Sequence, residues 1–318
     1  MIRRAALWVL AAPLAVTGGC DQGKSTPSGG SPNASANQES TWRADSTVLA
    51  SKPTILFRTF AHEKGRGIAP IATISDGGLR QLKLGNRGWR AFDVAYLHEG
   101  NTLDAVRDGR ASGTVRLTRG MWESSGQLDS IPRCRLIPTG LSDAPASIAL
   151  ALAGARPALK PTAPLSSDEL QEALHKAPLL IAPSNGVPIG LLSRYRREVH
   201  VMATGVTSRP SILVIYNDPE KVSDKLHPIG QRPRHLVTVL DKGLYGYRTS
   251  FEFSTLGNAQ TEPRMTFLDY VDVDGDGKAE LFFGFKYRHI EQQLDATKAY
   301  HYENDRWKEV FRASVRCP

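Results

Sequence analysis

An acidic run near the C-terminus is the densest group of chemically active side chains in this 318-residue sequence. Four carboxylates fall within nine residues, in the order Asp272, Asp274, Asp276 and Glu280. The whole chain has a formal net charge of +8, so these acids are not part of a generally acidic surface. Like charges a few ångströms apart in a tight loop repel one another by about 1 to 4 kcal/mol per contact. The folded loop therefore favours a bound cation.

The spacing of the acids indicates which cation. Carboxylates at loop positions 1, 3, 5 and 9, Gly277 at position 6 and the Lys278 carbonyl at position 7 reproduce the first part of an EF-hand ligand pattern. Position 12, a bidentate Glu in an EF-hand, is Phe283, so a helix–loop–helix EF-hand is not predicted. Hard oxygen ligands without an interleaved His or Cys favour Ca²⁺. The alternative is a surface turn without a metal, because Asp and Gly are ordinary turn residues.

The pattern Asp-x-Asp-x-Asp-Gly-x-x-Glu, followed by Leu281-Phe282-Phe283-Gly284, resembles the calcium-bearing loop of FG-GAP and VCBS-type repeats. In that family the loop joins two β-strands, usually in a propeller blade, and the ion is structural. The resemblance covers residues 269–284, and the family's further copies are missing. It implies a ligand set of the Asp272, Asp274, Asp276 and Glu280 carboxylates and the Lys278 main-chain oxygen.

The N-terminus has the parts of an export signal. Two arginines lie within residues 1–4, an apolar run too short to span a bilayer covers residues 5–16, and small residues precede Cys20. The end of this segment resembles the lipobox of bacterial lipoproteins, in which the cysteine is acylated and becomes the new N-terminus. Residues 23–40 are polar and rich in Gly, Ser, Pro and Asn, which predicts a flexible tether. The alternative is an ordinary Cys20 after a conventional signal cut.

Composition and strand-length apolar runs predict a mainly β fold. Gly and Pro number 28 and 20, and so many turn residues favour short elements over a helical bundle. Asp-Gly pairs at 76–77 and 108–109 predict tight hairpins. Strands are predicted over residues 54–60, 71–75, 79–84, 91–97, 103–107, 114–118, 198–204, 211–216, 236–240, 247–253, 265–271, 281–287, 299–302 and 307–313.

One helix is predicted, near residues 167–177. Ser166 and Glu169 form a capping-box pattern before an amphipathic stretch, and Pro178 is expected to end the helix.

These elements divide the chain into a signal peptide (1–19), a lipidated cysteine with a tether (20–42), an N-terminal β domain (43–142), an Ala/Pro-rich connector with a short helix (143–178) and a C-terminal β domain with the calcium loop (179–318). One degenerate β-propeller is the alternative to two β domains, although no repeat of fixed period is present.

No catalytic motif accompanies the acidic run. The sequence contains neither two histidines at zincin spacing nor a Gly-x-Ser-x-Gly elbow, so no catalytic residue is predicted. An active site assembled from scattered residues stays open, because most triads have no local signature. Cys134 and Cys317 are candidates for one disulfide in an oxidising compartment, and two free thiols are the alternative.

The net positive charge of the chain indicates which kinds of partner it could bind. Basic side chains gather at residues 194–197, 232–234 and 286–288, but export argues against nucleic acid. Anionic lipid headgroups or envelope polymers are the available partners, with solvated strand faces as the alternative. We therefore expect an exported protein, anchored by lipid on the periplasmic or cell-surface side, that acts as a non-enzymatic binding or structural module. An envelope hydrolase for glycans or lipids and an inhibitor of wall-lytic enzymes are the alternatives. The sequence identifies no protein partner.

Overall fold

The computed structural model describes residues 53–62, 65–75, 78–82, 91–118, 137–140, 149–154, 159, 162–218, 233–256, 264–289 and 292–316. The predicted signal and tether, Cys20, Cys134 and Cys317 lie outside these residues. Export, lipidation and the disulfide therefore stay predictions. Within the described ranges, no helix combines the length and the apolar character needed to cross a membrane.

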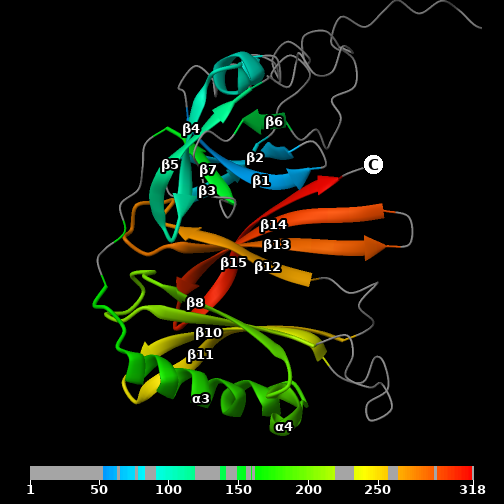
Figure 1. The fold of residues 1–318 in the computed structure, drawn as a ribbon. Coiled ribbons are helices and arrows are strands. Elements are labelled where there is room, and N and C mark those ends of the chain that lie inside the picture. Colours follow the sequence, from blue (N-terminus) through cyan, green and yellow to red (C-terminus); the bar gives the residue numbers. More distant parts are fainter. Residues whose placement is uncertain are drawn as a thin grey trace, which may run out of the picture. The chain divides into compact units, whose positions relative to one another are not determined.

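Three antiparallel sheets dominate the described part of the chain, which confirms the mainly β class (Figure 1). The first sheet contains β1 (Thr54–His62), β2 (Gly65–Ser75), β3 (Gly78–Gln81), β4 (Thr102–Arg107), β5 (Arg110–Leu117), β6 (Ile137–Gly140) and β7 (Leu150–Ala153). The second contains β8 (Arg196–Met202), β9 (Ser211–Asn217), β10 (Pro233–Gly243) and β11 (Gly246–Leu256). The third contains β12 (Arg264–Val271), β13 (Glu280–His289), β14 (Gln292–Glu303) and β15 (Arg306–Arg316). The helical elements are η1 (Asp93–Leu97), α3 (Ser167–Ser184) and α4 (Ile189–Leu192).

The sheets differ in topology. The second and third are meanders in which each strand pairs with the next one in the chain. The first has the order β1-β7-β4-β5-β6-β2-β3, and β1 also pairs with β2. Strand β7 lies in the segment 143–178 that we expected to be a connector, yet it pairs with both β1 and β4. This part of the expected connector therefore belongs to the first sheet, because its apolar residues complete the sheet's core.

The second sheet is covered on both faces. Along β9, Ile212, Val214 and Tyr216 pack against α3 and α4, whereas Leu213 and Ile215 pack against the third sheet. Figure 1 shows the two helices on the outer face of this sheet. A strand that is buried on both faces reads as a continuous apolar run rather than as an alternating one. Burial on both faces explains why the apolar run of β9 is not interrupted by polar residues.

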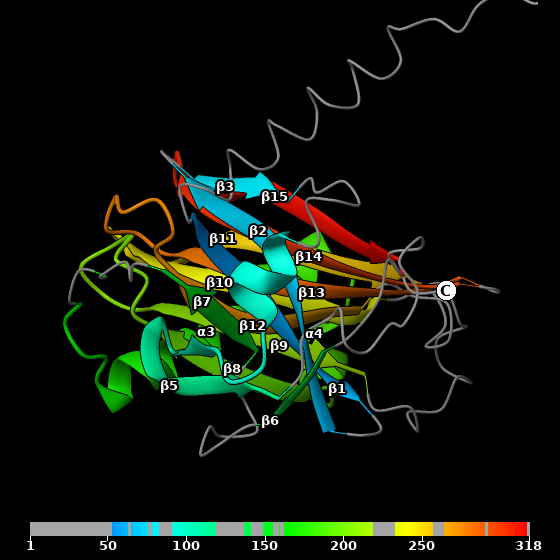
Figure 2. The ribbon, with the colours of Figure 1, turned by 90° about the horizontal axis from the view of Figure 1, so that it is seen from above.

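The third sheet is likewise covered on both faces. Leu281, Phe283 and Phe285 of β13 face the second sheet, and Phe282 between them packs with Leu56 of the first sheet. Polar contacts also join the first and third sheets. Figure 2 shows β3 beside β15, where Gln81 Nε2 donates to the Arg312 carbonyl at 3.0 Å.

Two hairpins close with two-residue turns in the left-handed region. Asp108 and Gly109 have φ angles of 51° and 71°, which confirms the hairpin predicted there between β4 and β5. Asn304 and Asp305 take the same conformation, with φ angles of 51° and 66°, between β14 and β15. Positive φ at both central positions matches the right-handed twist of the flanking strands.

Two predictions about elements were wrong. The capping box of Ser166 and Glu169 is present, but α3 continues past Pro178 to Ser184, so it also crosses the expected domain boundary after residue 178. The apolar stripe of the helix extends to Ile181, and its packing on the second sheet offsets the hydrogen bond that Pro178 cannot donate. Residues 91–97 are helical rather than a strand. Phe92 and Tyr96 lie four residues apart, so a helical turn places both rings in the core, 5.0 Å apart.

Candidate metal centre

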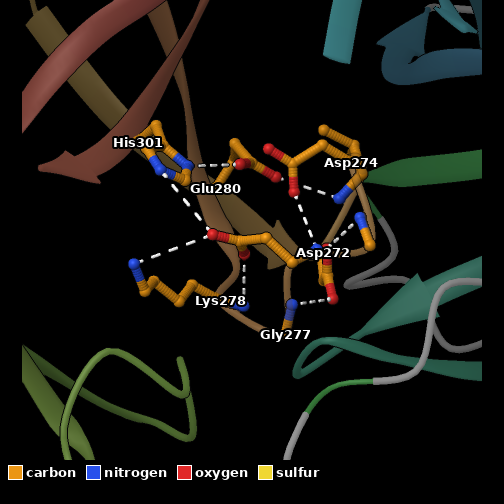
Figure 3. A network of polar contacts seen from close by, with 9 residues as sticks. Asp272, Asp274, Gly277, Lys278, Glu280 and His301 are labelled. Carbon is orange, nitrogen blue, oxygen red and sulfur yellow. Dashed lines mark hydrogen bonds and ion pairs between the residues drawn. The ribbon is translucent and has the colours of Figure 1, made fainter. Parts of the chain in front are cut away.

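The acidic loop connects β12 to β13, and Figure 3 shows its side chains together with His301. Its ends are held by the pairing of Val271 with Glu280. The side chains of Asp272 and Glu280 are buried, with exposed fractions of 1% and 2%. Those of Asp274 and Asp276 are exposed. The loop therefore has a buried base and an open rim.

Asp272 organises the base of the loop. Its Oδ1 accepts the Gly275 N–H at 2.7 Å, and its Oδ2 accepts the Gly277 N–H at 2.9 Å. Both glycines have positive φ, 79° and 86°, a conformation that side-chain-bearing residues rarely adopt. Burial raises the pKa of the Asp272 carboxyl, and the two main-chain N–H groups oppose this shift.

The exposed carboxylates of Asp274 and Asp276 each accept a hydrogen bond from the main-chain N–H two residues further along the loop. Asp274 Oδ1 accepts the Asp276 N–H at 3.1 Å, and Asp276 Oδ1 accepts the Lys278 N–H at 2.7 Å. These turns bring the carboxylates of Asp272, Asp274 and Asp276 together, with one oxygen of each within 4.8 Å of the others. Three converging carboxylates form a group that can hold a metal ion.

A histidine joins the site from a neighbouring strand. His301 of β14 places Nδ1 2.7 Å from Glu280 Oε1, and Glu280 Oε2 accepts the Val273 N–H at 2.9 Å. Asp274, Glu280 and His301 form a second group with ligand atoms within 4.8 Å. Burial raises the pKa of Glu280 to about 7, against the opposing effects of the Val273 N–H and of His301.

All five predicted metal residues belong to this loop, and the contacts of Lys278 leave its predicted role untested. Its main-chain N–H donates to Asp276, and its ammonium lies 3.7 Å from Asp276 Oδ2. The ammonium thus balances part of the loop's negative charge. A ligand role for its main-chain oxygen stays a prediction.

The connection between β8 and β9 supports the loop from outside. The Ala279 N–H donates to the Thr204 carbonyl at 2.8 Å. Next to it, Gly205 approaches so closely that a Cβ built on it would lie 2.3 Å from the Gly277 carbonyl oxygen. The loop is therefore held in place by the second sheet as well as by its own hairpin.

A further buried carboxylate, Asp241 of β10, is saturated by hydrogen bonds instead. Ser211 and Ser250 donate to it at 2.5 Å each, and Trp307 Nε1 donates at 2.9 Å. Burial raises the pKa of Asp241, and these three donors oppose the shift. Since Trp307 belongs to β15, the network joins the second and third sheets. Its donors already satisfy both oxygens, so it offers little to a ligand.

Comparisons of the chain with protein-family models, curated proteins and solved structures give no match. The site's properties therefore rest on its own geometry.

Proposed function

We propose that the chain is an exported, lipid-anchored envelope protein whose loop of residues 272–280 binds one structural Ca²⁺. In this proposal the protein is a non-enzymatic binding or structural module. The observation that carries it is the convergence of the Asp272, Asp274 and Asp276 carboxylates within 4.8 Å. The lipobox-like segment before Cys20 and the polar tether after it support the anchor.

The ligand chemistry supports calcium over softer metals. Oxygens from four carboxylates suit a hard divalent cation, and the resemblance to FG-GAP and VCBS-type loops agrees with this choice. Among the described residues, His301 is the histidine that groups with these carboxylates, and its 2.7 Å contact with Glu280 suits a residue that orients a metal ligand. Direct binding of a transition metal through His301 is the competing interpretation.

The surroundings support a structural role for the ion. The loop contacts β14 through His301 and the β8–β9 connection through Thr204. A cation among the acids would remove their mutual repulsion and offset the burial of Asp272 and Glu280. It would thereby fix a junction between the second and third sheets.

The proposal predicts that Ca²⁺ raises the melting temperature of the purified full-length protein and that excess EDTA lowers it. With a dissociation constant of about 10 μM and about 1 mM free Ca²⁺, linkage stabilises the fold by about 2.7 kcal/mol. Calorimetric titration with Ca²⁺, Mn²⁺ and Zn²⁺ identifies the preferred metal. Equal melting curves with EDTA and with Ca²⁺ would contradict the structural role, and preferential zinc binding would contradict the choice of metal.

Asp274→Asn tests the ligand set in the same titration. Asp274 is exposed, and an asparagine oxygen can still accept the Asp276 N–H, so the variant should fold. Its calcium affinity should fall at least tenfold, because one ligand charge is lost. Asp168→Asn removes one exposed acid in the first turn of α3 and should bind calcium as the wild type does.

A further inference from the structure

A cavity of about 490 Å³ lies where the two helices meet the second sheet. Leu174 and His175 of α3 line it together with Leu192 of α4, and Tyr195, Arg197 and Tyr216 line it from the sheet side. Its volume lies in the range of small-molecule sites, about 300 to 1,000 Å³. The metal loop contacts a different part of the second sheet, so the cavity is a separate feature.

Among the described residues, the cavity is lined by a positive charge and by no negative one. Arg197 lines it, and none of the described lining residues is acidic. Arg197 also forms no ion pair with a carboxylate in the part of the chain that the structure describes. It is the direct cross-strand partner of Tyr216, so the two side chains leave the sheet on the same face. Val199, two residues along β8, packs into the helix-facing cluster and confirms which face this is.

The Tyr216 hydroxyl adds an unused polar group. The side chain is 2% exposed, and its hydroxyl has no hydrogen-bond partner of ordinary geometry among the described residues. Burial raises the pKa of Tyr216 to about 12, although the charge of Arg197 and a hydrogen bond from its side chain oppose the shift. The hydroxyl oxygen thus faces the Arg197 guanidinium as an acceptor, while the hydroxyl proton has no acceptor among the described residues, a state that is rare for buried donors.

The other lining residues are mixed: Gln171, His175 and Ser193 are polar, and the rest are apolar. Leu174, Leu192 and Tyr195 are each at least nine-tenths buried and belong to the cluster between the helices and the sheet. A ligand here would therefore meet the Arg197 cation together with apolar side chains and a few neutral polar ones. Such a site suits a molecule with an anionic head and an apolar body.

We propose that this cavity binds a small organic oxyanion, with Arg197 pairing with the oxyanion and the Tyr216 hydroxyl donating to it. The apolar part of the ligand packs against Leu174, Pro178 and Tyr195. The hydroxyl is screened from solvent in the present arrangement, so the contact requires a rotation of the exposed Arg197 side chain. The ligand class includes carboxylates and phosphate monoesters, which share this head-group chemistry.

The test is calorimetric titration of the full-length, calcium-loaded protein with probes that differ in their head group. 4-Phenylbutyrate and 4-phenylbutyl phosphate supply the two anions, and 4-phenylbutanamide and 4-phenylbutylamine supply neutral and cationic heads on the same body. We expect at least one anion to bind about tenfold or more tightly than the amide, with the amine weakest. The stronger of the two anions identifies the source of the oxyanion. Equal binding of anion and amide, or no saturable binding of either anion, would overturn the proposal.

Two variants assign the contacts. Arg197→Gln should weaken anion binding about tenfold or more. The control is Arg196→Gln, because Arg196 is also exposed but its side chain leaves the opposite face of β8. This variant should change anion binding less than about twofold. Tyr216→Phe should weaken binding about fivefold or more without lowering the melting temperature, because it removes an unpaired buried hydroxyl. Equal losses for Arg197→Gln and Arg196→Gln would overturn the role of Arg197, and wild-type affinity in Tyr216→Phe would overturn that of the hydroxyl.

Discussion

At the scale of single residues, His235 is held in one neutral form by two hydrogen bonds. Its Nε2 accepts the Met265 N–H at 3.2 Å, so Nδ1, 2.8 Å from Asn217 Oδ1, carries the proton and donates. Burial lowers the pKa of His235 to about 4. The side chain connects β10 with β9 in the second sheet and with β12 in the third.

This lowered pKa predicts that acid destabilises the fold through His235. As pH falls from 6.5 towards 4, the unfolded chain binds a proton that the folded chain does not, so stability decreases by up to about 3 kcal/mol. Chemical denaturation at several pH values should show a smaller loss across this window for His235→Gln than for the wild type. His175→Gln, at an exposed histidine of α3, should keep the wild-type dependence. Equal pH dependence of wild type and His235→Gln would contradict the prediction.

The residues of the candidate site could be predicted only where they are close in sequence. The spacing of Asp272, Asp274 and Asp276 in one short loop predicted that their carboxylates converge, and Glu280 joins Asp274 in a second group. His301 could not be predicted from that spacing. It reaches Glu280 because Tyr300 pairs with Leu281, and the register of two long strands depends on packing that the sequence pattern does not reveal.

At the scale of elements, most strand positions could be predicted from the sequence, whereas the end of α3, the helical segment 91–97 and strand β7 could not. The apolar runs of β9 and β13 identified both strands correctly. A proline in α3 and the apolar run at residues 91–97 were misleading, because tertiary packing overrode the local preference. The assignment of β7 to the first sheet also depended on partners distant in the sequence.

The β8–β9 connection should control the position of the metal loop. Gly205 has a φ of 75°, and an added Cβ would lie 2.3 Å from the Gly277 carbonyl oxygen. Gly205→Ala should therefore lower the unfolding free energy by about 1 to 3 kcal/mol and weaken calcium binding, because Gly277 must move. Denaturation and calcium titration measure the two effects.

Gly190→Ala in α4 is the matched control, because an added Cβ there meets open space. This variant should be unchanged or stabilised by up to about 1 kcal/mol. Calcium affinity that is unaffected in Gly205→Ala would contradict the supporting role of the β8–β9 connection.

At the scale of the whole molecule, the third sheet is the layer shared by the other two. Arg58 of β1 is buried against it and donates to the Ala296 carbonyl and to Thr297 Oγ1, each at 3.3 Å. Gly284 leaves room for this side chain, since a Cβ there would lie 2.7 Å from the Arg58 guanidinium. The sequence indicated the strands but not this order of layers, because the contacts join residues far apart in the chain.

The proposed anchor concerns the molecule as a whole and can be tested in bacterial cells that export the chain. The wild type should incorporate a labelled fatty acid and fractionate with membranes. Cys20→Ser should lose the label and leave the membrane fraction, because the acylated residue is missing. Cys134→Ser is the matched control and should keep both properties. Fatty-acid incorporation that persists in Cys20→Ser would contradict the lipoprotein proposal.

The meander topology has a consequence for the order of folding. In the second and third sheets every strand pairs with its neighbour in the chain, so each hairpin closes a loop at low entropic cost. In the first sheet, Ile55 pairs with Ala153, which lies far away in the sequence. The contact between Arg58 of this sheet and Ala296 of the third sheet spans a still longer part of the chain. Contacts at such sequence separation form slowly. The two meanders should therefore assemble early, and the docking of the first sheet onto the third should set the overall folding rate.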